Sequence, residues 1–209
     1  CRPTAASEER TCARSILGRL GGEAYRRPMR AAEVDSLMPF FEKGAATGGF
    51  EAGVRTALEA VLASPHFVFR MERDRPAAAT EHTVRIADLG VASRLSFFLW
   101  GAPPDQELID LATTGRLTAP GMLEKQAKRM LEDPRAEALG ERFAAQWLRL
   151  QDLDKVHPDP NFFPNFDENV GSAMKRETEM FFNDLVRRDQ SFLNFFTADY
   201  TFVNERLAR

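Results

Sequence analysis

The chain has 209 residues and a formal net charge of -3, with hydrophobic residues at 44% and charged residues at 28%. These proportions are those of a globular protein and exclude the disordered, collagen-like and low-complexity classes. The small negative charge supplies no basic excess to neutralise phosphates, so no nucleic-acid partner is expected. The longest apolar runs fall far short of the about 20 residues that cross a bilayer, so no membrane span is expected.

The N-terminal third shows the periodicity of amphipathic helices. Helices are predicted over residues 8–20 and 31–43, and residues 44–49 are predicted to form the loop after the second. A third helix is predicted over residues 49–64, because apolar side chains recur there every three or four positions. It should end before Pro65, since proline pushes the preceding residue out of the helical region and can start a new turn.

Further helices are predicted after a Pro- and Ala-containing boundary at residues 75–83, which has no periodicity. Their ranges are 86–100, 105–112, 119–132, 135–150 and 167–188, followed by broken turns over 192–209. No alternating strand pattern is present, so the sequence predicts an all-α fold of about eight helices, with long Pro- and Gly-punctuated loops and no significant sheet. We expect a small helical domain over residues 1–76 and a second over 84–209 that continues beyond the chain end in a parent protein.

Cys1 and Cys12 are the only cysteines, and both lie in a polar N-terminal arm. Their spacing matches neither a CxxC redox motif nor a zinc site, and no histidine follows as in c-type haem attachment. A disulfide in an oxidising compartment is the favoured interpretation, with unpaired thiols and a metal site as the alternatives. Because the chain begins with cysteine rather than methionine, we expect it to be a mature or excised piece of a larger protein.

Several short strings occur in a characteristic order along nearly the whole chain. They are YRRP at 25–28, SPHFVFR at 64–70, ASRLSFFLW at 92–100, RMLEDPR at 129–135, QWL at 146–148, ET at 177–178 and FF at 181–182. Together they resemble two adjacent domains of unknown function found in large planctomycete-cytochrome-associated proteins of bacteria. The first domain would cover roughly residues 12–73 and the second roughly residues 84–209.

The resemblance implies a location and a set of partners, but it implies no reaction mechanism. Such proteins are typically exported, which implies a periplasmic or extracellular location. Many carry a c-type cytochrome module, so haem c would belong to the parent protein, whereas this chain has no CxxCH string and is expected to hold no cofactor. The partners implied are the other domains of the parent, a cytochrome module among them. The family brings no established catalytic residues that could be assigned here.

Three residues are candidates for catalysis, each with a structural alternative. Glu177 falls on the apolar stripe of the predicted helix 167–188, where a buried carboxylate must be paired or have its pKa raised. An ion pair with Arg94 would satisfy both side chains, and a general acid or base is the alternative. His66, beside the break at Pro65, is either a metal, haem or acid–base group or a hydrogen-bonded histidine at a helix start.

Two neighbouring arginines are candidates for binding. Arg26 and Arg27, next to Tyr25, could clamp an anion or a substrate carboxylate, and surface or interdomain salt bridges are the alternative. His157 and Asp159 offer a metal only two ligands with no third at a suitable spacing, so no metal site is expected.

These observations favour a non-catalytic helical scaffold or docking module of a larger exported, cytochrome-linked protein. The alternative is part of an extracytoplasmic oxidoreductase or polymer-degrading enzyme with a cleft between the two halves. A cleft that holds Glu177, Arg94 or Arg27 with shifted pKa values would favour the enzyme, whereas a large exposed apolar patch would favour docking. Trp147 continues the apolar stripe of Leu139 and Phe143 and is expected in the core.

Overall fold

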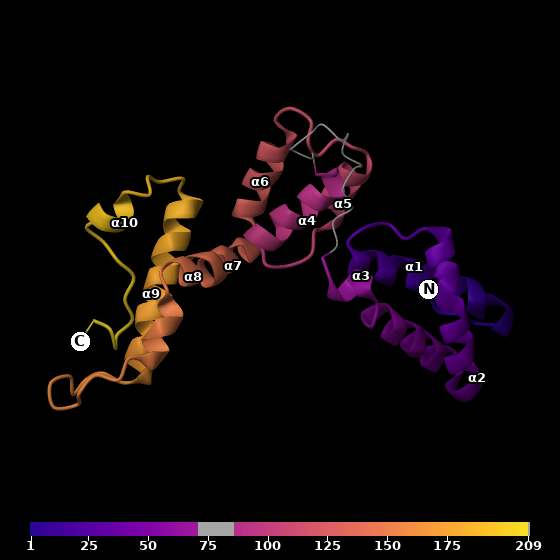
Figure 1. The fold of residues 1–209 in the computed structure, drawn as a ribbon, viewed down its shortest axis with the longest axis horizontal. Coiled ribbons are helices and arrows are strands. Elements are labelled where there is room, and N and C mark those ends of the chain that lie inside the picture. The colour runs from indigo at the N-terminus through magenta and orange to yellow at the C-terminus, as the bar shows by residue number, and fades with distance from the viewer. Residues whose placement is uncertain (71–85, 209) are drawn as a thin grey trace, which may run out of the picture. The chain divides into compact units, whose positions relative to one another are not determined.

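The computed structural model describes residues 1–70 and 86–208, and the regular secondary structure of these ranges is helical, which confirms the all-α prediction (Figure 1). Packing divides the chain into two compact units, the first comprising Cys1–Arg94 and Pro103–Met122 and the second Leu95–Ala102 and Leu123–Arg209. The predicted boundary at residues 75–83 lies outside the described residues, and the division at 76 and 84 stays a prediction. In the described ranges, no helix is both long and apolar enough to cross a membrane.

Helix α1, Ala6–Tyr25, opens the first unit and continues past its predicted end at residue 20. The prediction was wrong because Gly21 serves a close contact: a Cβ atom at this position would overlap the Met29 side chain. Glycine costs a helix about 1 kcal/mol relative to alanine, a cost that this packing offsets. At the other end of α1, the sulfur atoms of Cys1 and Cys12 lie at disulfide-bonding distance, with Cα atoms 5.6 Å apart.

Helix α2, Ala31–Leu62, contains both helices predicted over residues 31–43 and 49–64, and a kink separates its two arms. Residues 44–47 continue the helix, and the backbone leaves helical geometry only at Gly48 and Gly49, where the φ angle of Gly49 is 75°. A Cβ atom at Gly53 would lie 2.7 Å from the ring of Phe41, so glycine lets the two arms of α2 approach each other. The predicted interruption is therefore present but shorter than residues 44–49, because these glycines permit a sharp kink in place of a loop.

Helix α3, Pro65–Val68, follows Ser64, whose hydroxyl accepts a hydrogen bond from the backbone N–H of His66 at 3.3 Å. The predicted end of the preceding helix before Pro65 is therefore confirmed. Helices α1, α2 and α3 contact one another. Their buried core comprises Ala13, Leu17, Leu37, Met38, Phe41, Ala57 and Val61.

The next three helices lie close to the predicted ranges and are α4, Asp88–Leu99, α5, Gln106–Thr113, and α6, Met122–Glu132. Asp105 caps α5, because its carboxylate accepts a hydrogen bond from the Leu108 N–H at 3.0 Å. Trp100 is buried after α4, and its indole N–H donates to the Met130 carbonyl oxygen at 2.9 Å. The Arg135 guanidinium lies 3.5 Å from the centre of the Trp100 ring.

The helix predicted over residues 135–150 is present, with helical backbone from residue 134 to 147, but its pitch changes along a series of short segments. They are η1, Pro134–Ala136, α7, Glu137–Leu139, the π-helical turn η2, Gly140–Ala144, α8, Ala145–Trp147, and η3, Leu150–Lys155. The change of pitch begins at Gly140, where a Cβ atom would lie 2.7 Å from the amide nitrogen of Asn183. A residue inserted into a helix of about 3.6 residues per turn rotates the following side chains by about 100°, which displaces the predicted apolar stripe.

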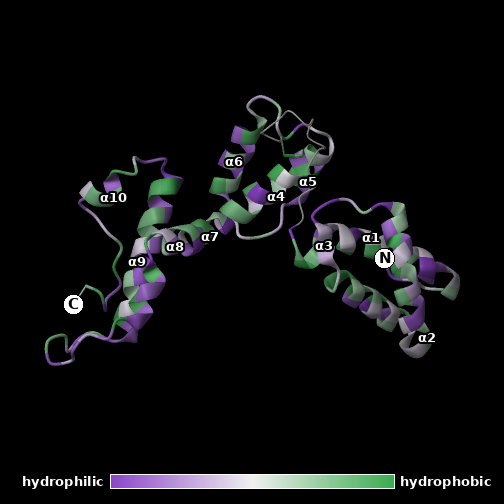
Figure 2. Ribbon diagram, in the orientation of Figure 1, coloured by the Kyte–Doolittle hydropathy of each residue, from purple (hydrophilic) through white to green (hydrophobic). Residues whose placement is uncertain are grey.

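The second unit ends with α9, Glu168–Arg187, and α10, Asn194–Thr197. The Asp167 carboxylate caps α9 by accepting a hydrogen bond from the Val170 N–H at 2.9 Å. Figure 2 shows that hydrophobic and hydrophilic residues alternate along α9, as in an amphipathic helix. Its buried apolar side chains include Phe182, which contacts aromatic rings from two neighbouring segments. The predicted helix over 167–188 is confirmed.

Candidate functional site

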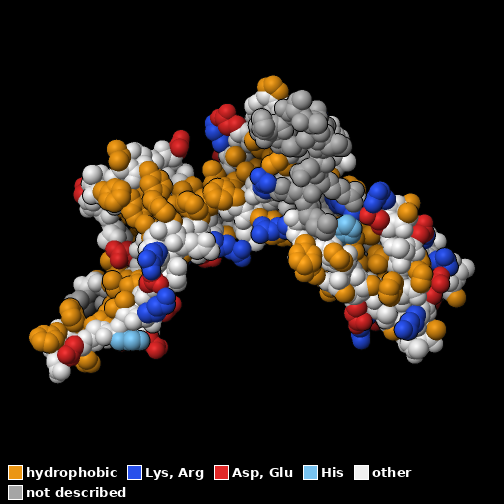
Figure 3. Space-filling view, in the orientation of Figure 1, with side chains coloured by type: hydrophobic (Ala, Val, Ile, Leu, Met, Phe, Trp, Pro, Cys, Tyr) orange, Lys and Arg blue, Asp and Glu red, His pale blue; other side chains and the backbone are white. Residues whose placement is uncertain are grey.

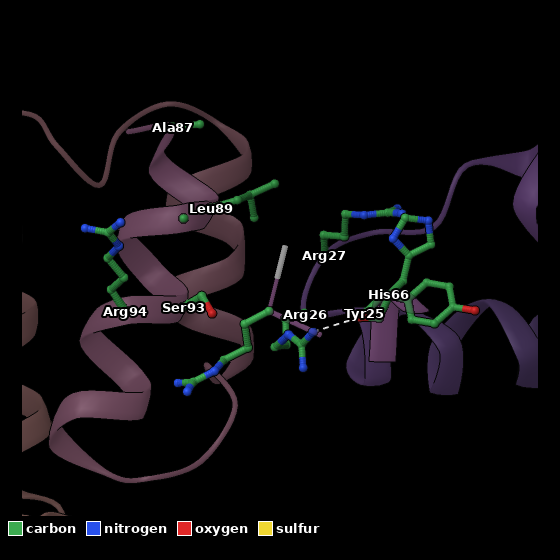
Figure 4. Close-up of a pocket in the computed structure, with 10 residues that line it drawn as sticks. Tyr25, Arg26, Arg27, His66, Ala87, Leu89, Ser93 and Arg94 are labelled. Carbon is green, nitrogen blue, oxygen red and sulfur yellow. Dashed lines mark hydrogen bonds between the residues drawn. The ribbon is translucent and has the colours of Figure 1, made fainter. Parts of the chain in front are cut away.

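The first unit contains a cavity of about 520 Å³ that is lined by many cationic side chains (Figure 4). The described lining residues are Tyr25, Arg26, Arg27, His66, Arg70, Ala87, Leu89, Gly90, Ser93 and Arg94. Four of these ten are arginines and none is acidic. A volume of this size falls within the range of about 300–1,000 Å³ that is typical of small-molecule pockets.

Arg26 ties the end of α1 to α3. Its backbone has a φ angle of 57°, and this left-handed turn ends α1. The guanidinium donates hydrogen bonds to the carbonyl oxygens of His66 at 2.7 Å, Phe69 at 3.0 Å and Phe67 at 3.4 Å. Partial burial, and secondarily the nearby charge of Arg70, lower the pKa of Arg26. Within the described ranges Arg26 pairs with no carboxylate, so its charge is balanced by carbonyl dipoles alone.

Arg27 has a different partner. Its guanidinium donates two hydrogen bonds to the Glu33 carboxylate, at 2.8 and 2.7 Å. Glu33 also accepts a hydrogen bond from the backbone N–H of Arg30 at 2.9 Å, which fixes the start of α2. The Arg27 guanidinium holds the pKa of Glu33 well below its usual range, and Glu33 raises the pKa of Arg27 in turn. Arg27 is therefore neutralised within its own unit.

An aromatic pair forms the adjoining wall of the cavity. The rings of Tyr25 and His66 lie 5.3 Å apart between centroids, and the Arg27 guanidinium is 5.7 Å from the centre of the Tyr25 ring. His66 stands at the start of α3, with its backbone N–H bonded to the Ser64 hydroxyl. Its ring also lines the cavity, beside the Arg27 side chain (Figure 4).

The two remaining catalytic candidates lie in different units. Arg94 lines the cavity from α4, and its guanidinium points away from Arg26 and Arg27 in Figure 4. Glu177 lies on α9, is half-buried, and accepts a hydrogen bond from the Thr201 hydroxyl. The ion pair predicted between Arg94 and Glu177 stays a prediction. A group of three or more His, Cys, Asp or Glu side chains that could hold a metal is not found among the described residues.

The second unit carries a set of aromatic rings that we call the aromatic surface. It consists of Phe98, Phe143, Trp147, Phe192, Phe195 and Phe196. Successive rings of this series are in contact, with centroids 5.7, 6.2, 5.4, 5.8 and 6.3 Å apart. Hydrophobic side chains gather over α8, α9 and α10 in Figure 3.

Most of the aromatic surface is open to solvent. Phe196 is 82% exposed, Phe98 54% and Trp147 51%. The prediction that Trp147 lies in the core was wrong, because the π-helical turn η2 precedes it and rotates its side chain away from the predicted stripe. Contiguous exposed apolar area of this kind is uncommon on monomeric soluble proteins. The Phe-rich string at 192–196 is the sequence signal that could have indicated it.

Comparison with known proteins places these features in a family. A family model described as PSD4, protein of unknown function (DUF1592), matches residues 86–209. A second model, described as PSD5, protein of unknown function (DUF1595), matches residues 12–72. No curated protein and no solved structure matches the chain. Since the first model covers more than half of its residues, the chain belongs to the DUF1592 family, with a DUF1595 segment preceding that match.

Proposed function

We propose that this chain is a non-catalytic helical docking module of a larger exported, cytochrome-linked protein. The exposed aromatic surface of the second unit carries the proposal, because Trp and Phe side chains are the residues that supply most binding energy in protein interfaces. Its partner is a folded domain of the same parent protein that presents an apolar face.

The chemistry around the aromatic surface favours a protein partner over a lipid surface. Residues 189–204, which supply half of its rings, contain no lysine or arginine and include Asp189 and Asp199. Membrane-surface segments combine apolar side chains with basic ones that attract anionic lipids. Phenylalanine has no polar group, so the ring faces here suit an apolar protein surface.

Two further observations support this context. The sulfur atoms of Cys1 and Cys12 lie at disulfide-bonding distance, which is compatible with the oxidising compartments that exported proteins reach. The described lining of the cavity in the first unit holds no carboxylate, whereas a polymer hydrolase of the usual glycosidase type needs a pair of them.

Site-specific photocrosslinking tests the proposal on the full-length exported protein. A benzophenone amino acid is introduced at Phe196 in the aromatic surface, and in a matched variant at Phe162, which is 78% exposed and lies outside it. We expect crosslinks from position 196, and not from position 162, to peptides of another domain of the same polypeptide. Crosslinks from position 196 only to lipid, only to a second copy of this chain, or in the same pattern as from position 162 would contradict the proposal.

A further inference from the structure

We propose that the cavity of the first unit binds a small aromatic carboxylate. This inference goes beyond docking and concerns the other unit, so neither depends on the other. It rests on the wall formed by the end of α1 and by α3, where Tyr25, Arg26, Arg27 and His66 come together.

The wall carries one positive charge that has no carboxylate partner in the described ranges. Arg27 is neutralised by Glu33, whereas the Arg26 guanidinium is held only by the main-chain oxygens of residues 66, 67 and 69. A buried or half-buried cation is stabilised by an anion nearby. Arg70 and Arg94 also line the cavity and add to its positive charge, which favours an anionic ligand. The planar Arg26 guanidinium suits the two coplanar oxygens of a carboxylate.

The same wall offers hydrogen-bonding groups that the described residues leave unused. The structure gives no hydrogen bond to the ring nitrogens of His66 from any described residue, whereas the Tyr25 hydroxyl points away from Arg26 (Figure 4). Both rings line the cavity. The His66 ring is therefore available to donate a hydrogen bond to a ligand in the cavity, in addition to the Arg26 guanidinium.

The other residues that line the cavity indicate the chemistry of the uncharged part of the ligand. Tyr25 and His66 contribute aromatic rings, and Ala87, Leu89 and Gly90 add apolar surface from the segment that starts α4. An aromatic ring can stack on the ring pair while its carboxylate lies toward Arg26. The volume of about 520 Å³ leaves room for a ligand of this size.

The wall is also held in place before any ligand binds. Arg26 fixes α3 against α1, the Arg27–Glu33 pair fixes the start of α2, and Met29 packs against Gly21 of α1. Side chains that are already immobile lose little entropy on binding, which favours affinity for a small ligand.

Titration of the oxidised 209-residue chain with benzoate tests the inference, with benzamide as the neutral analogue and inorganic phosphate as the competing anion. Two-dimensional NMR follows the backbone amides of residues 25–27 and 66–69 and the Nε–H of Arg26. We expect benzoate to shift these signals saturably, benzamide to leave them unshifted, and phosphate to compete at least about tenfold more weakly, which corresponds to about 1.4 kcal/mol.

Three variants locate the site. His66→Phe keeps the ring but removes the nitrogens, and should weaken benzoate binding by about tenfold or more. Arg26→Gln should abolish binding, with its fold checked by circular dichroism since it also loses contacts to α3. Arg19→Gln, on the same helix but paired with Glu23 at the surface, is the matched control and should bind as the parent does. Failure of benzoate to bind, preference for phosphate, or equal affinity of the His66→Phe and Arg19→Gln variants would overturn the inference.

Discussion

Arg26 and Arg27 are neighbours of the same type, yet their charges are balanced in different ways. Arg27 meets a carboxylate in a two-bond pair, and Arg26 meets only carbonyl oxygens. The difference arises from backbone geometry, because the left-handed turn at Arg26 directs consecutive side chains toward α3 and toward the start of α2. Sequence alone identified both residues but could not say which would be neutralised, since the partners lie 40 and 6 positions away.

The Arg27–Glu33 pair gives a prediction about stability. The side chains of Arg27 and Glu33 are only 16% and 17% exposed, so Glu33→Gln should lower the free energy of unfolding by about 1–3 kcal/mol at pH 7. Urea titration measures this. The matched control is Glu23→Gln, whose pair with Arg19 is 60% and 65% exposed and should cost less than about 1 kcal/mol.

The effect of Glu33→Gln should also depend on pH with a defined sign. The pKa of Glu33 is lowered in the folded state, so its contribution is fully present above the unfolded value of about 4.3 and is lost as pH falls toward the folded value. The difference in free energy of unfolding between the parent and the Glu33→Gln variant should therefore be constant from about pH 5 to 7 and shrink below about pH 4. A difference that grows on acidification would show that Glu33 is not the stabilised anion.

At the scale of elements, helix ends that a capping residue or a proline marks were predicted from the sequence. Kinks and changes of pitch that depend on close packing against another segment were not. Asp167 marks the start of α9 and Pro65 the end of α2, and both signals are local. The close approach of the two arms of α2 at Gly53 and the π-helical turn that begins at Gly140 depend instead on contacts with Phe41 and Asn183. Periodicity within a segment contains no information about such long-range partners, so these parts could not be predicted.

The two tryptophans give a prediction for the second unit. Trp100 is 3% exposed and is hydrogen-bonded to Met130, so Trp100→Ala should lower the free energy of unfolding by about 3–5 kcal/mol. Trp147 is 51% exposed and contacts mainly other rings of the aromatic surface, so Trp147→Ala should cost about 1 kcal/mol. Urea titration followed by circular dichroism compares the two variants, and equal losses would show that Trp147 is packed in the core.

At the scale of the whole molecule, the cysteine pair bears on the cellular compartment in which the protein resides. Cys1 and Cys12 were predicted to pair from their position in a polar arm, and the structure brings their sulfur atoms to bonding distance. In protein isolated from its native host without reductant, we expect neither thiol to react with an alkylating reagent until a reductant is added. Mass spectrometry detects the label, and two reactive thiols in freshly isolated protein would contradict both the pairing and the proposed export.

The order of the two units along the chain bears on how such a protein can be cut or recombined. The first unit takes in residues 103–122, which follow a segment of the second, so the chain crosses from one unit to the other three times. The DUF1592 match at residues 86–209 consequently takes in part of the first unit as well as the second. We therefore expect the two segments to be inherited together, and a gene truncated between them to yield products that are both incomplete.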